Sequence, residues 1–104
     1  MIKVHVSYRD DVINKIMISG HALYDDYGRD IVCASVSSTY LCTVNAIFAL
    51  YDDSIYVYDE DDKQEIQVLK VEHVVQVLLQ NMIRCFESLE KQYPNNIKLD
   101  KEEE

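Results

Sequence analysis

Residues 31–50 read IVCASVSSTYLCTVNAIFAL, and the fold depends on whether this stretch forms a strand or a helix. Its many β-branched residues are typical of a buried strand, but no glycine or proline interrupts it. Apolar residues recur every four positions from Val32 to Phe48, and Asp30 stands where a helix N-cap is favoured. The sequence therefore predicts a helix that begins near Ile31.

The segments around this helix predict two hairpins and a second helix. Residues 2–8 alternate apolar and polar side chains, and residues 12–19 return as the second strand of a hairpin. Residues 54–71 contain two apolar runs around an acidic turn, which indicates a second hairpin. Residues 74–93 carry an amphipathic stripe that ends before Pro94.

A short final strand from NIKL, residues 96–99, completes the order β-β-α-β-β-α-β. This order predicts an α+β fold, with an antiparallel or mixed sheet of four to five strands and two helices packed on one face. At 104 residues we expect a single domain over residues 1–99, followed by a solvated acidic tail at residues 100–104.

Composition restricts the class of partner. The formal net charge of −9 argues against direct binding of nucleic acid, which requires clustered Lys and Arg. No stretch approaches the roughly 20 apolar residues that a membrane span needs, and the N-terminus lacks a signal-peptide core. We therefore expect a cytoplasmic protein that does not associate with membranes.

The cysteines number three, Cys33, Cys42 and Cys85, at spacings that match neither a disulfide framework nor a zinc pattern. Cys42 and Cys85 fall inside the predicted helices and are interpreted as small core residues. Residues 59–62 (DEDD) lack the glycine and the terminal Glu of a calcium loop. We predict no metal site and no cofactor.

Cys33 has a distinct position, because it falls in the first turn of the predicted helix at 31–50. Unpaired amides and the helix dipole favour an anion there, so the site favours a thiolate and provides donors for an oxyanion. His21 precedes it on a loop and could serve as its base. Taken alone, the pair is also compatible with two structural residues.

The chain's two glycines, Gly20 and Gly28, flank this loop. Glycine permits unusual backbone angles and close approach, so the segment from His21 to Asp30 is interpreted as a lid over the site. The alternative is that both glycines serve ordinary turns.

The run SGHALYDDYGRDIVCASVS, residues 19–37, and the ending YPNNIKL together resemble the ribosomal-processing cysteine protease family, Prp. The resemblance implies a homodimeric protease domain with a mobile loop over its site. It also implies an endopeptidase that removes the N-terminal extension of a large-subunit ribosomal protein, its peptide partner. The family's nucleophile corresponds to Cys33 and its base to His21. The motif also matches at four positions with supporting or substrate-binding roles: Gly20, Gly28, Asp30 and Ser37.

Two other interpretations remain open. In the first, the chain is a non-catalytic, ribosome-associated dimeric interaction protein in which Cys33 and His21 are structural. In the second, it is another thiol enzyme, such as an acyltransferase or a redox protein. The absence of a resolving cysteine at C-x-x-C spacing counts against the redox version.

Overall fold

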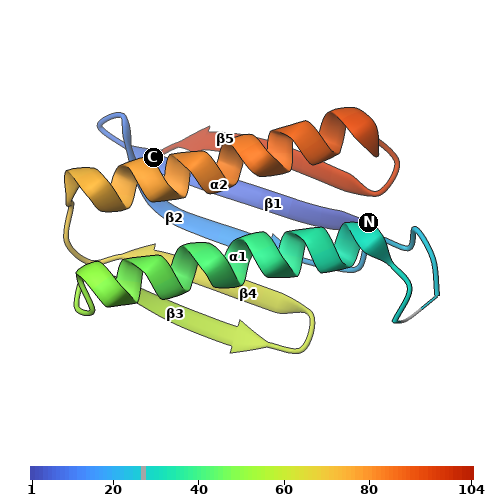
Figure 1. Ribbon diagram of the computed structural model, residues 1–104. Coiled ribbons are helices and arrows are strands. Elements are labelled where there is room, and N and C mark those ends of the chain that lie inside the picture. Colours follow the sequence, from blue (N-terminus) through green and yellow to red (C-terminus); the bar gives the residue numbers. More distant parts are fainter. Residues whose placement is uncertain (27) are drawn as a thin grey trace.

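Two long helices lie side by side over one face of a five-stranded sheet (Figure 1). The computed structural model describes residues 1–26 and 28–104. In chain order the elements are β1 (Ile2–Arg9), β2 (Val12–Ser19), α1 (Ile31–Leu50), β3 (Ile55–Glu60), β4 (Lys63–Val68), α2 (His73–Gln92) and β5 (Ile97–Glu103). The sheet order is β3-β4-β2-β1-β5, in which β1 and β5 are parallel and the other neighbours are antiparallel. This mixed sheet with both helices on one face confirms the predicted α+β fold.

The core lies between the two helices and the sheet. Strand β1 turns alternate side chains inward, and Ile2, Val4 and Val6 are buried. Helix α2 buries one stripe of its surface, formed by Val75, Leu79, Met82, Ile83 and Phe86. Burying one such side chain stabilises a fold by about 1.5–3 kcal/mol, so this stripe holds α2 firmly against its neighbours.

Helix α1 begins at Ile31 and ends at Leu50, as predicted, but its buried face differs from the expected one. Ile47 is fully buried, whereas Phe48 is 39% exposed. A helix has 3.6 residues per turn, so a repeat of four drifts by about 40° at each step and has left the buried face by Phe48. The prediction that Cys42 is a core residue is also wrong: Cys42 lies about 200° around the helix from the buried Tyr40, and it is exposed. Cys85 in α2 is half-buried.

By length and composition alone, α1 could cross a membrane. The expectation that no stretch of the chain reaches this threshold is therefore wrong for residues 31–50. In the structure the apolar side chains of Val36, Tyr40 and Val44 belong to the core, whereas those of Leu41 and Leu50 are exposed. A core helix of a globular domain passes the same test.

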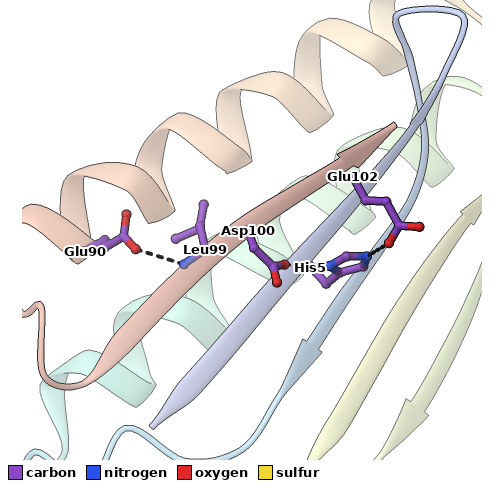
Figure 2. Close-up of polar contacts among 5 residues, drawn as sticks. All are labelled: His5, Glu90, Leu99, Asp100 and Glu102. Carbon is purple, nitrogen blue, oxygen red and sulfur yellow. Dashed lines mark hydrogen bonds and ion pairs between the residues drawn. The ribbon is translucent and has the colours of Figure 1, made fainter. Parts of the chain in front are cut away.

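The acidic C-terminus continues the sheet, so residues 100–103 form the end of a strand and not a separate tail, although they are exposed as predicted. Strand β5 pairs in parallel with β1 and sets Asp100 opposite His5. On the open face of the sheet, His5 Nδ1 lies 2.5 Å from Asp100 Oδ1, and His5 Nε2 lies 2.9 Å from Glu102 Oε2 (Figure 2). The hydrogen bond to Asp100, followed by the charges of both carboxylates and the contact with Glu102, raises the pKa of His5 despite partial desolvation.

Further contacts explain why an acidic segment forms a strand here. Arg9 lies 2.9 Å from the carboxylate of Glu104 and offsets its charge. On the outer edge of β5, the Glu90 carboxylate of α2 accepts the backbone amide of Leu99 at 2.9 Å (Figure 2). Contacts with side chains of β1 and α2 therefore hold this acidic segment in the sheet.

Candidate active site

The start of α1 is held by the side chain of Asp30. Its Oδ1 accepts hydrogen bonds from the amides of Val32 and Cys33, each at 3.0 Å. Its Oδ2 accepts the amide of Tyr24, also at 3.0 Å. Desolvation raises the pKa of this carboxyl, but the hydrogen bonds from backbone amides, that of Cys33 first, outweigh it and lower the pKa overall. Asp30 therefore stays ionised and ties the preceding loop to the helix.

Cys33 lies in the first turn of α1, as predicted, and is half-buried. Its sulfur accepts a hydrogen bond from the backbone amide of Ala22 at 3.3 Å. This N–H and the positive end of the helix dipole both favour negative charge on the sulfur. The thiolate is the nucleophilic form of cysteine, so the surroundings of Cys33 suit nucleophilic attack.

Three amides in the first turn of α1, those of Val32, Cys33 and Ala34, already have acceptors. The side chain of Asp30 accepts from Val32 and Cys33, and its backbone carbonyl accepts from Ala34 at 3.0 Å. An oxyanion would have to compete with these acceptors for the three amides, and their role as oxyanion donors stays a prediction. The amide directed at the sulfur belongs to Ala22.

The backbone conformation directly before His21 requires glycine at position 20. Its φ is +86°, and a Cβ on it would lie 2.4 Å from the carbonyl oxygen of Met1, so a larger residue does not fit. The Gly20 amide donates to the carbonyl of Asp62 at 3.0 Å. His21 follows, exposed, and lines the same cleft as Cys33. Its imidazole has no hydrogen-bond partner among the described residues, so no hydrogen bond to those residues holds the ring away from Cys33.

This cleft has a volume of about 670 Å³. All six residues singled out from the sequence line it: Gly20, His21, Gly28, Asp30, Cys33 and Ser37. The predicted lid, residues 21–30, forms one wall, although Tyr27 within it lies outside the described residues. Gly28 has a φ of +86° with open space around it, so only its backbone angle calls for glycine. The catalytic assignment of Cys33 and His21 stays a prediction, as does the movement of the lid.

The cleft is acidic. Four of its lining residues are carboxylates: Asp25, Asp30, Asp61 and Asp62. Asp61 and Asp62 come from the turn between β3 and β4, for which the sequence predicts only a turn without a calcium pattern. No local signal assigns this turn to the cleft, because it arrives there through the pairing of β4 with β2.

Two residues between α2 and β5 support the loop from behind. The ring of Tyr93 packs edge-on against Tyr24, with centroids 5.2 Å apart. Asn96 Nδ2 donates a hydrogen bond to the carbonyl of Ala22 at 2.9 Å. Neither residue is predicted from the sequence to have a function at the site.

No metal centre is evident in the described ranges, 1–26 and 28–104, where no group of three or more His, Cys, Asp or Glu side chains is arranged to hold an ion.

A thiol that receives a hydrogen bond at the start of a helix, with an exposed imidazole on the same cleft, is the kind of arrangement that cysteine proteases use. The molecule is a cysteine protease. More particularly, the chain belongs to the family of the cysteine protease Prp, whose model matches residues 1–98. This membership confirms the resemblance carried by residues 19–37.

Individual relatives agree with the family assignment. The chain is 30% identical over 104 residues to the ribosomal processing cysteine protease Prp of Staphylococcus aureus, an alignment that covers 96% of this chain and 98% of the relative. The crystal structure of S. aureus Prp with a covalently linked product peptide superimposes with a TM-score of 0.93 at 30% identity, covering 97% of this chain and 99% of that chain. The structure of the same protease with a substrate peptide gives a TM-score of 0.86 at 28% identity and the same coverage.

Proposed function

We propose that this chain is an endopeptidase that removes the N-terminal extension of a large-subunit ribosomal protein during ribosome maturation. Cys33 is the nucleophile, and His21 is the general acid and base. The observation that carries the proposal is the Ala22 amide on the Cys33 sulfur, in the cleft that His21 also lines. The S. aureus relative, with its covalently linked product peptide, supports a reaction that passes through a covalent intermediate.

The reaction is an acyl transfer to sulfur followed by hydrolysis. The Cys33 thiolate attacks the carbonyl carbon, a C–S bond forms, and the carbonyl π electrons move to oxygen. The oxyanion then lies beside the sulfur, within reach of the Ala22 amide. The imidazolium of His21 gives its proton to the leaving nitrogen as the C–N bond breaks. Neutral His21 then takes a proton from water, whose oxygen attacks the thioester and releases the acid and the thiolate.

The charge of the cleft supports a basic substrate. Asp25, Asp30, Asp61 and Asp62 line it, and the whole chain carries a formal charge of −9. Ribosomal proteins use Lys and Arg to bind RNA phosphates, so peptides from them match this potential. The same negative charge argues against direct binding of nucleic acid by this chain.

We propose that the enzyme works in the cytoplasm as a homodimer. Tyr56 and Tyr58 are 53% and 41% exposed, and they lie on the sheet face opposite the one that Ile55 buries. Exposed aromatic side chains of this kind favour association with a second copy. Light scattering should give about twice the monomer mass of 12.1 kDa.

A peptide copying the extension and the first mature residues of the ribosomal protein tests the activity. Wild type and Cys42→Ala should cleave it, Cys33→Ala should give no product, and His21→Ala should be slower by about 100-fold or more. Equal product from wild type and Cys33→Ala would overturn the proposal. If every variant bound the peptide and none cleaved it, the chain would be the non-catalytic interaction protein instead.

A further inference from the structure

We propose that Asn96 is a positioning residue of the active site, because its side chain holds the carbonyl of Ala22 and thereby fixes the Ala22 amide on the sulfur of Cys33. The inference rests on the proposed function, in which that amide faces first the thiolate and then the oxyanion.

Asn96 is itself firmly held. Its backbone carbonyl accepts the amide of Ile2 at 2.9 Å, and its own amide donates to the carbonyl of Tyr93 at 2.9 Å. These bonds join it to the start of β1 and to the end of α2. Its Nδ2 then reaches Ala22 at 2.9 Å, across 74 positions of sequence. The amide side chain therefore links the loop to two elements of the fold.

The loop needs such a support because its backbone is strained. Leu23 has a φ of +56°, which costs an L-residue with a side chain about 1–2 kcal/mol. Strain of this kind persists only where surrounding contacts hold it. On one side Asn96 holds the carbonyl of Ala22, and on the other Asp30 accepts the amide of Tyr24 at 3.0 Å. Removing the Asn96 contact lets the segment relax and takes the Ala22 amide off the sulfur.

Loss of the Asn96 contact should affect the chemical step more than the binding of substrate. A catalytic group displaced by about 1 Å can lower the rate by about 100-fold. Ala22 is buried, at 1% exposure, and Asn96 is not among the residues that line the cleft, so neither side chain offers a large surface to substrate. Loss of Asn96 should therefore lower kcat and leave KM nearly unchanged.

The test compares Asn96→Ala with Asn95→Ala in the full chain. Asn95 is the adjacent, exposed residue with the same side chain and serves as the matched control. With the extension peptide, Asn96→Ala should lower kcat by about 10-fold or more with KM within about twofold, whereas Asn95→Ala should match wild type. Alkylation of Cys33 by iodoacetamide, measured against Cys42 in the same molecule, should slow in Asn96→Ala alone.

Asn96→Asp separates positioning from a general loss of stability. A carboxylate at this position cannot donate to the Ala22 carbonyl, but a protonated carboxyl can. The ratio of Asn96→Asp activity to Asn96→Ala activity should therefore rise as the pH falls from about 7.5 to about 5. A flat ratio, or an Asn96→Ala variant with the kcat and Cys33 reactivity of Asn95→Ala, would overturn the inference. If wild type leaves the peptide intact while Cys33 alkylation still depends on Asn96, the proposed function fails and the positioning role stands.

Discussion

Substitution of Asp30 separates its two structural contributions. Asp30→Ala removes the cap on the amides of Val32 and Cys33 and also the bond to the amide of Tyr24. An N-cap contributes about 1 kcal/mol and a single hydrogen bond about 0.5–1.5 kcal/mol, so the free energy of unfolding should fall by about 2 kcal/mol. Asp30→Asn keeps an oxygen for the cap but presents its NH2 group to the Tyr24 amide, so it should lose about 1 kcal/mol.

Urea and thermal unfolding measure these differences directly. For a domain of this size about 1 kcal/mol lowers Tm by about 4–8 °C, so Asp30→Asn should melt about 5 °C and Asp30→Ala about 10 °C below wild type. Equal losses in the two variants would refute the assignment of a separate bond to Tyr24. No loss in either would refute the cap.

The pH dependence of the same comparison follows from the lowered pKa of Asp30. A carboxyl whose folded pKa is depressed contributes stability above its unfolded pKa of about 3.9, and this contribution is lost as the pH falls through the folded value. The advantage of wild type over Asp30→Asn should therefore be constant near neutral pH and shrink below about pH 4. An advantage that is unchanged well below that pH would contradict the role of the charged form.

Four further substitutions test other parts of the structure. Gly20→Ala should lower the free energy of unfolding by about 2 kcal/mol or more, because Gly20 has a positive φ and a Cβ there would collide with Met1. Gly28 has the same φ but open space around it, so Gly28→Ala should lower it by only about 1 kcal/mol. Urea unfolding of both variants measures the difference. The pKa of His5 is raised in the folded state, so its ion pairs stabilise the fold fully below about pH 6.5, and this stabilisation is lost as the pH rises through the folded pKa. The difference in the free energy of unfolding between wild type and His5→Gln should therefore shrink between about pH 6 and pH 9. A difference that grows would contradict the pairing. Asp62→Asn should lower kcat/KM for a basic peptide by at most about fivefold at low salt and flatten its salt dependence, and an unchanged salt dependence would exclude Asp62 from substrate attraction.

The sequence predicts the elements and the local geometry of the site well, because those depend on neighbours in the chain. The cap at Asp30 and the place of Cys33 in the first turn follow from residues within three positions of each other. The error at Phe48 arises from a repeat of four imposed on a helix with 3.6 residues per turn. The error at Cys42 arises because a position inside a helix does not by itself determine which face the residue lies on.

The features that the sequence did not predict depend on distant parts of the chain. The acidic C-terminus becomes a strand through a register that sets Asp100 beside His5, and no nearby residue signals that pairing. The sequence does not identify Asn96, because its partner is the backbone carbonyl of Ala22 and every residue has such a carbonyl. The acidic turn at Asp62 reaches the cleft only once β4 pairs with β2.

The activation of one thiol among three is the central claim, and competitive alkylation tests it most directly. Cys42 is exposed, whereas Cys33 and Cys85 are half-buried, so accessibility alone predicts that Cys42 reacts first. Limiting iodoacetamide near neutral pH, followed by mass spectrometry of the peptides, should instead find Cys33 modified well ahead of Cys42 and Cys85. Faster modification of Cys42 would contradict the account, because the Ala22 amide and the start of α1 would then confer no special reactivity on Cys33.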